Sequence, residues 1–358
     1  MSQSRRTIEK LLKHDALPLA NAHAAATHLE VYPSRRTWLV FFDRAALIIG
    51  AVALALSLVF FIAYNWQNLG TMGKFALVEG ALVLTIALYV ALSFRRRYKL
   101  VRQLLLLVAS IITGSLLALF GQTYQTGADT WQLFFGWAAL ITPWVLIARF
   151  PALWLLWLGL VNASLTLYLD VVDFAFASYF YQSILQIGLL AIVNFVALTL
   201  WLLCLENMRL SQRDLSKPAS PVKVDLHWST YVVGLVSALL ITGSSIITIF
   251  DEIEVLASVI TFLLWVSWSG FMLWRFYKTS INLLMLTYLC GSAIIVVIFW
   301  AGRLLLDNFD AGGFLVLALL LIGMSSAAVV WLRKLAHLTN ENYNSNLPHT
   351  VARGDSHE

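Results

Sequence analysis

Residues 45–66 read AALIIGAVALALSLVFFIAYNW, and this stretch decides the class of fold. It contains no Lys, Arg, Asp or Glu over its whole length. An α-helix needs about twenty mostly apolar residues to cross the hydrocarbon layer of a bilayer, which is about 30 Å thick. The stretch therefore predicts a membrane-spanning helix.

The composition of the whole chain leads to the same class. Of its 358 residues, 60% are hydrophobic and only 12% are charged. Soluble domains average about half apolar and about a quarter charged residues. A soluble fold of this length could not bury so much apolar surface, so the composition indicates an integral membrane protein.

Working outward from residues 45–66, further apolar runs meet the same length test. The full set predicts ten spans, at residues 45–66, 73–94, 102–120, 131–149, 152–169, 182–205, 229–250, 255–274, 280–301 and 313–332. We expect an all-α fold, a polytopic transmembrane helix bundle of about ten spans.

The positions of Lys and Arg predict the orientation of this bundle. With the N-terminus inside, all of the 24 basic residues except Lys74 and Arg303 fall in inner segments. Cytoplasmic loops are enriched in Lys and Arg, and acidic residues such as Asp170 fall outside here. We therefore expect both termini in the cytoplasm.

The spans and the polar segments between them predict five regions. They are a cytoplasmic N-terminal helical segment at 1–44, a first membrane half at 45–205, a cytoplasmic linker at 206–228, a second membrane half at 229–332 and a disordered cytoplasmic tail at 333–358. The linker contains two prolines, and the tail is rich in Asn and other polar residues.

Three segments of the first half resemble a known family. They are YNWQNLG at 64–70, GQTYQTGADTWQLFFGW at 121–137 and PWVLIARFPALWLLWLGLVNASLTLY at 143–168. This series is similar to a family of bacterial multi-pass membrane proteins defined as a domain of unknown function. The matching positions are Asn65, Trp66, Gly121, Gln122, Tyr124, Asp129 and Arg149. The resemblance implies a membrane fold, a bacterial inner (cytoplasmic) membrane location and no particular activity.

The polar segment between the third and fourth spans is the first candidate site. We expect it at the outer face, bending through Gly121 and Gly127, with Asp129 capping the fourth helix. Gln122, Tyr124 and Asp129, with Asn65 and Trp66 close by, form a candidate site for a small polar ligand or a partner. The alternative is a stiff loop that only joins two helices.

A second candidate site lies within the spans. Glu79 is a carboxylate inside the second span, and such groups are costly in hydrocarbon and are usually either functional or paired. Gln182, Gln186 and Asn194 follow roughly one face of the sixth span. These four residues are candidates for a transport pathway. The alternatives are a water-accessible carboxylate near the surface and hydrogen bonds between helices, and Asn162 has the same two interpretations.

The sequence gives little support for metal, phosphate-binding or cysteine chemistry. The chain has no His-Glu-x-x-His and no phosphate-binding glycine loop, and its two cysteines lie far apart. We therefore expect no metal, no cofactor and no nucleic acid partner. The expected partners are membrane lipids and another membrane or periplasmic protein, and the oligomeric state stays open.

These observations leave three functions open. The first is a non-enzymatic membrane protein that binds a partner or a small polar ligand at its periplasmic face. The second is a transporter of small solutes, in which a protonatable Glu79 would allow proton coupling. The third is a membrane-embedded enzyme that modifies lipids or glycans, which would need cations beside the acids of the outer loops.

Overall fold

A computed structural model describes residue 8 and residues 11–12, 17–28, 35–65, 67–95, 98–125, 127–171, 179–211, 226–250, 255–279, 281–305 and 311–345. Within the helices, the side chains of residues 179–184, 205–211, 250, 255–257, 311 and 339–345 lie outside this description. All the regular structure in the described ranges is helical, which confirms the predicted all-α fold.

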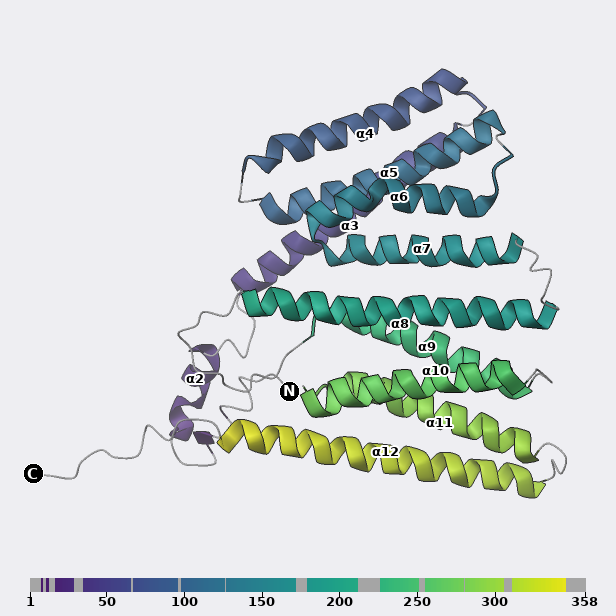
Figure 1. Cartoon of the computed structure of the whole chain (residues 1–358). Coiled ribbons are helices and arrows are strands. Elements are labelled where there is room, and N and C mark those ends of the chain that lie inside the picture. Colours follow the sequence, from purple (N-terminus) through teal and green to yellow (C-terminus); the bar gives the residue numbers. More distant parts are fainter. Residues whose placement is uncertain are drawn as a thin grey trace, which may run out of the picture. The chain divides into compact units, whose positions relative to one another are not determined.

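Ten long helices dominate this part of the chain. They are α3 (Arg35–Tyr64), α4 (Thr71–Ser93), α5 (Lys99–Tyr124), α6 (Thr130–Ala148), α7 (Pro151–Val171), α8 (Tyr179–Ser211), α9 (Trp228–Phe250), α10 (Val255–Leu273), α11 (Leu283–Leu305) and α12 (Ala311–Ser345) (Figure 1). Each of them contains a stretch long and apolar enough to span a membrane, so the predicted ten spans are confirmed within the described residues.

Shorter helices flank these elements. A 3₁₀ turn, η1 (Leu19–Asn21), and α2 (Ala22–His28) lie within the predicted N-terminal helical segment. A π-helix, η3 (Trp274–Thr279), continues α10 at its end.

Several helix ends differ from the predicted boundaries. Helix α3 begins at Arg35 rather than at residue 45, α5 continues through Gly121 to Tyr124, and α12 continues to Ser345 into the predicted tail. A helix does not have to end where the hydrocarbon ends, because backbone hydrogen bonding propagates into polar sequence that has helix-forming side chains. Residues 346–358 of that tail lie outside the described residues.

The chain divides into two compact units. Unit 1 comprises Met1–Asp129 and Gly136–Leu153, and unit 2 comprises Thr130–Phe135 and Trp154–Glu358. The first residues of α6 therefore belong to unit 2 and the rest of that helix to unit 1. The linker predicted at 206–228 stays a prediction, because residues 212–225 lie outside the described ranges.

Helix α5 is the centre of unit 1, where α3 and α4 pack against it. Its buried face includes Ser110 and Gly114. The indole of Trp137 in α6 lies directly over Gly114, where an added Cβ would be only 2.4 Å from the ring. The indole Nε1 donates to the Ser110 carbonyl oxygen over 2.7 Å. This close approach joins α5 to α6.

Helix α9 has the same place in unit 2, where α8, α10 and α11 pack against it. The core around it contains the fully buried side chains of Trp268, Met272 and Met285. Gly234 lets α11 come close, because an added Cβ there would lie 2.8 Å from the Met285 sulfur. Unit 2 thus has a dense apolar core of its own.

Candidate functional site

Two facing lines of polar side chains run along α7 and α8 in unit 2. On α7 they are Asn162, Thr166 and Asp170, and on α8 they are Gln186 and Asn194. Residues four or eight apart in a helix lie on one face, so each line forms a single stripe. Eight residues of helix extend about 12 Å, so the stripe of α7 reaches from the middle of the helix almost to its end.

The deepest members form a reciprocal amide pair. The Asn162 Nδ2 donates to the Asn194 Oδ1 over 3.3 Å, and the Asn194 Nδ2 donates back to the Asn162 Oδ1. Each amide also donates to the backbone carbonyl one turn earlier, that of Leu158 and that of Leu190, both over 2.8 Å. Asn194 is completely buried.

The outer members continue the same network. The Thr166 hydroxyl donates to the Asn162 carbonyl oxygen over 2.9 Å. One turn further along, the Gln186 Nε2 donates to the Thr166 carbonyl oxygen over 3.2 Å and to the Asp170 Oδ1 over 2.9 Å. Asp170 itself is exposed at the end of α7. The polar stripes therefore lead from an exposed carboxyl group to a buried amide pair.

A pocket of about 340 Å³ opens beside this network, between α7, α8 and α9. Its polar lining consists of Asn162, Thr166 and Asn194. The remaining lining is Gly159 and the apolar side chains Leu155, Leu158, Leu190, Val232, Val233, Val236 and Leu240. A concave apolar site with a few convergent polar groups is the usual form of a small-molecule site.

Beyond the amide pair the helices are apolar. Leu158 on α7 and Leu198 and Leu202 on α8 are buried in the core of unit 2. Trp154 and Trp201 meet edge to face on the same two helices, with ring centroids 6.3 Å apart. The polar network therefore ends near the middle of the two helices, and packed apolar side chains follow it.

The predicted outer site has a different arrangement. Tyr124 is the last residue of α5, and Gln122 lies two positions before it. Both side chains are exposed. Residues two apart in a helix are separated by roughly 200° of rotation about its axis, so these two side chains point away from each other and do not converge. Gly121 is helical, and the chain turns instead at Gln125 and Gly127, which both have left-handed φ angles of 43° and 64°.

Asp129 has the position of an N-cap but not its predicted hydrogen bond. It precedes α6 with extended backbone angles, yet its carboxyl group makes no capping hydrogen bond and is exposed. Tyr124 packs against Phe75 and Phe120, with ring centroids 5.9 Å and 4.8 Å away. The phenol is nevertheless 58% exposed at the surface of unit 1.

Asn65 and Trp66 complete that prediction. The Asn65 Nδ2 donates to the Phe61 carbonyl oxygen over 3.0 Å, so its amide closes the end of its own helix. The Asn65 carbonyl oxygen accepts from the backbone N–H of Asn68 and Leu69 in the following turn. Trp66 lies outside the described residues.

The predicted transport residues are only partly brought together. Gln186 and Asn194 share the α7–α8 network, whereas the Gln182 side chain lies outside the description. Glu79 belongs to the other unit, on the exposed face of α4 with Val83 and Leu84 one turn further along. Glu79 lines neither the hollow on α3 nor the pocket between α7, α8 and α9.

Sequence reasoning did not place Thr166 and Asp170 in a site. Their spacing of four and eight residues from Asn162 is a signal that could have found them, because it places all three on one face of α7. The pairing with α8 could not be found this way, since it depends on how two helices are rotated toward each other.

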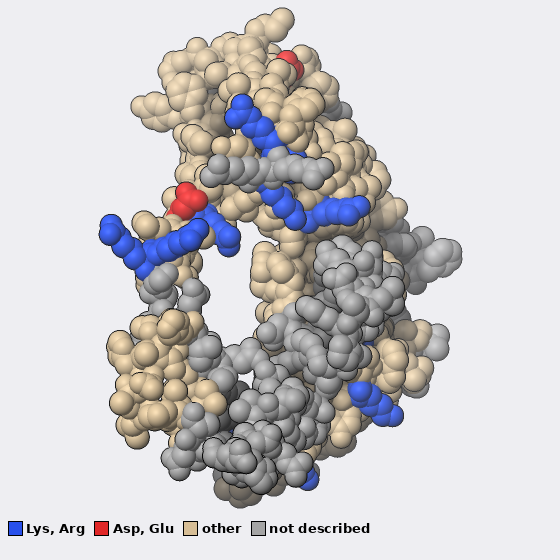
Figure 2. Space-filling view, turned by 90° about the vertical axis from the view of Figure 1, so that its left-hand side faces the viewer, with Lys and Arg blue, Asp and Glu red and all other residues tan. Residues whose placement is uncertain are grey.

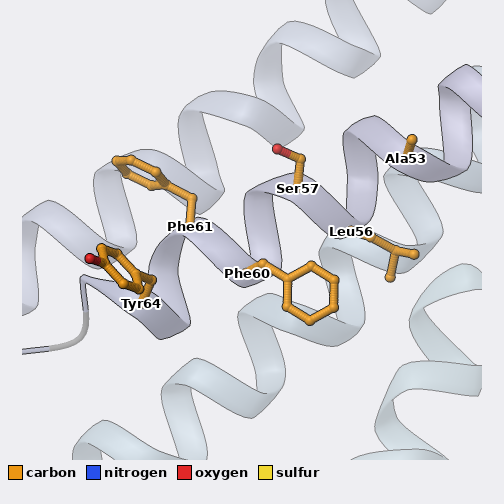
Figure 3. Close-up of a pocket in the computed structure, with 6 residues that line it drawn as sticks. All are labelled: Ala53, Leu56, Ser57, Phe60, Phe61 and Tyr64. Atoms are coloured by element: carbon orange, nitrogen blue, oxygen red, sulfur yellow. The ribbon is translucent and has the colours of Figure 1, made fainter.

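A larger hollow on α3 is not a comparable site. Its lining residues, Ala53, Leu56, Ser57, Phe60, Phe61 and Tyr64, all belong to this one helix (Figure 3). No second element contributes to it, and Phe60 and Tyr64 are 67% and 88% exposed. This is an apolar helix surface of the kind that lipid covers.

Other buried polar groups in unit 2 make structural pairs. The Thr242 and Ser292 hydroxyls lie 2.6 Å apart, and the Trp265 Nε1 donates to the Ser292 Oγ. The Asn282 Nδ2 donates to the Tyr231 hydroxyl over 3.0 Å. None of these five residues lines the pocket. Within the described residues no group of three or more His, Cys, Asp or Glu side chains could hold a metal ion.

The fold and its exposed apolar surface define an α-helical integral membrane protein with many spans. Comparison with protein families agrees: residues 9–154 match the model of a family described as "Predicted membrane protein (DUF2157)". The matched region is the N-terminal part of the chain, where the sequence resemblance was found. Comparisons with curated proteins and with solved structures give no match.

Proposed function

We propose that this membrane protein is a carrier for a small polar solute, which it holds in the pocket between α7, α8 and α9. The supporting observation is the buried Asn162–Asn194 pair, which lies near mid-helix and lines that pocket. Polar residues at membrane depth are costly and commonly mark a solute pathway. Hydrogen bonding between helices alone would explain the pair but would not require an adjoining pocket.

The orientation of the carrier follows from its basic residues. In a chain whose helices cross the membrane in turn, Arg35, Lys99, Arg149 and Lys278 would all fall on the side on which α3 begins. Figure 2 looks onto that end, where Lys and Arg side chains are spread over the surface. Cytoplasmic ends are the basic ones. We infer a bacterial inner membrane location with cytoplasmic termini, and a solute that enters past Asp170 from the periplasm.

Uptake by the full chain in proteoliposomes tests this function. The probes are radiolabelled solutes of different charge, namely glycerol, alanine, n-butylammonium and butyrate. Uptake of at least one probe should exceed that of empty liposomes. Asn194→Leu should reduce this uptake by about tenfold or more, because it removes the partner that holds the Asn162 amide beside the pocket.

Asn282→Leu is the matched control. It also removes a half-buried amide of unit 2, but Asn282 bonds to Tyr231 and does not line the pocket. It should leave uptake within about twofold of the unaltered chain. Equal loss in both variants, or no uptake of any probe above empty liposomes, would contradict the carrier.

A second function is supported by the exposed phenol of Tyr124. This ring is held against Phe75 and Phe120 while more than half of it stays exposed. We propose that Tyr124, with Gln122 and Asp129 near it in sequence and together with Asn65 and Trp66, forms a surface where a membrane or periplasmic partner binds. Exposed aromatic side chains are common anchors in such contacts.

Affinity purification from native membranes tests this surface. A partner that co-purifies with the unaltered chain should be lost with Tyr124→Ala and with Asp129→Asn. The control is Gln125→Asn, a neighbouring polar residue at a position where Asn tolerates the left-handed backbone. Retention of every co-purifying protein in both variants would remove this proposal.

A further inference from the structure

The hydrogen bonds of the amide pair fix which atoms it offers to the pocket. A side-chain amide has two N–H donors and an oxygen with two lone pairs. Both donors of Asn162 are used, on Leu158 and on Asn194, and both donors of Asn194 are used in the same way. Each Oδ1 accepts only one of these bonds, so one acceptor position remains on each.

The orientation of the two amides follows from their surroundings. Rotating either amide by 180° would place its oxygen against the backbone carbonyl oxygen of Leu158 or Leu190. Two acceptors would then face each other in a buried site, which is unfavourable. The reciprocal pairing therefore holds both nitrogens toward the helix backbones. Because Asn194 has no exposed surface, the Oδ1 of the half-buried Asn162 is the amide acceptor that remains for a solute.

The rest of the polar network has the same character. The Thr166 hydroxyl uses its hydrogen on the Asn162 carbonyl oxygen and keeps its lone pairs. Gln186 uses both amide hydrogens, on Thr166 and on Asp170. At the outer end Asp170 adds an exposed carboxyl group. From the surface to the amide pair, these side chains present acceptors and no uncommitted donors.

This pattern selects the solute by charge and by hydrogen-bonding groups. An anion would meet only oxygen lone pairs, whereas a group with several N–H donors would satisfy them. The apolar lining, including Leu155 and Val236, suits a short hydrocarbon chain. The pocket thus combines acceptors for an ammonium head with an apolar wall for its tail.

We propose that the pocket binds a small primary ammonium cation with a short apolar chain. This inference rests on the proposed function, since it names the class of solute that the α7–α9 pocket takes. The ammonium N–H groups would donate to the Asn162 Oδ1 and to the Thr166 Oγ, while the fully buried Asn194 holds the Asn162 amide in place. Hydrogen bonds to a charged donor are the stronger kind, which matters at this depth in the membrane.

Equilibrium binding to the full chain in nanodiscs tests the class of solute. The probes are n-butylammonium, tetramethylammonium, n-butanol and butyrate, measured against empty nanodiscs. n-Butylammonium should bind at least about tenfold more tightly than tetramethylammonium, which has the charge but no N–H donor, and butyrate should not bind. n-Butanol, which has one donor and no charge, should bind weakly.

Two variants connect this binding to the pocket. Thr166→Val keeps the shape of the side chain and removes one acceptor, so it should weaken n-butylammonium binding by about tenfold. Its control is Thr242→Val, which alters a buried hydroxyl paired with Ser292 outside the pocket and should leave the affinity unchanged. Equal effects of the two variants would overturn the assignment.

The outcomes also separate this inference from the carrier function. Asn194-dependent uptake of glycerol, without preferential n-butylammonium binding, would overturn the solute class and keep the carrier. n-Butylammonium binding that depends on Thr166, without uptake of any probe, would keep the solute class and contradict the carrier. Tighter binding of tetramethylammonium or butyrate than of n-butylammonium would overturn the inference directly.

Discussion

At the scale of single residues, the side-chain amides of Asn162 and Asn194 hydrogen-bond to each other. Asn194 is fully buried, so its amide cannot hydrogen-bond to water and needs a partner within the protein. An unsatisfied buried polar group costs about 1–3 kcal/mol. In membranes the coupling between two such side chains is smaller, about 0.6 kcal/mol on average. The pair therefore stabilises the α7–α8 contact modestly and also shapes the pocket.

A double-mutant cycle measures this coupling. Asn162→Ala and Asn194→Ala should each lower the free energy of unfolding by about 1 kcal/mol, because each leaves one amide unpaired. The double variant should lose less than the sum, with a coupling of about 0.5–1.7 kcal/mol. Unfolding in bicelles provides the measurement, and strictly additive losses would mean that the two amides do not interact.

The residue scale also shows what the sequence could and could not predict about the site. Gln186 and Asn194 stood out because polar residues are rare in apolar runs. Asn162 stood out for the same reason, but its pairing with Asn194 depends on the rotation of α7 and α8 about their axes. Asp129 was predicted to form a capping hydrogen bond, yet only its backbone has the N-cap conformation.

At the scale of helices, long apolar runs predicted all ten spans, whereas helix ends were less predictable. The polar GQTY sequence at 121–124 suggested a loop, but those residues complete the last turn of α5. Gly121 can bend a chain, yet nothing in the contacts around it requires a bend. The helix ends at Gln125, which has a left-handed φ of 43°.

Replacing two glycines of α5 by alanine should have opposite effects on stability. Gly114→Ala should destabilise unit 1, because its Cβ would lie 2.4 Å from the Trp137 ring. Overpacking of this kind costs about 1–3 kcal/mol. Gly121→Ala should be neutral or stabilising by up to about 1 kcal/mol, since no atom lies within 4 Å and Ala favours helix. Thermal unfolding in detergent compares the two, and equal effects would contradict the α5–α6 packing.

At the scale of the whole molecule, the proposal concerns the orientation of the helices in the membrane. The proposed orientation places both termini in the cytoplasm, because the basic ends of the described spans would then lie on the cytoplasmic side. The N-terminal resemblance covers residues 9–154 and therefore ends where unit 2 begins its main part. The proposed pocket lies wholly beyond that region, so the family comparison neither supports nor contradicts it.

Labelling of single cysteines tests the topology. In a chain with Cys204 and Cys290 replaced by Ala, a membrane-impermeant thiol reagent added outside should modify Ala128→Cys. It should reach Lys278→Cys only after the membrane is opened. Both positions are exposed, so accessibility of the side chain is matched. The reverse pattern would invert the assigned orientation.

The most direct test of the central claim is the reactivity of a cysteine at Thr166, inside the proposed polar pocket. In the same cysteine-free chain, Thr166→Cys should react with the impermeant reagent added from the periplasmic side, because water reaches the pocket past Asp170. Leu189→Cys, on an exposed apolar part of α8, should not react, because lipid surrounds it and no thiolate forms there. Modification of Leu189→Cys, or an inert Thr166→Cys, would contradict a pocket that opens to the periplasm.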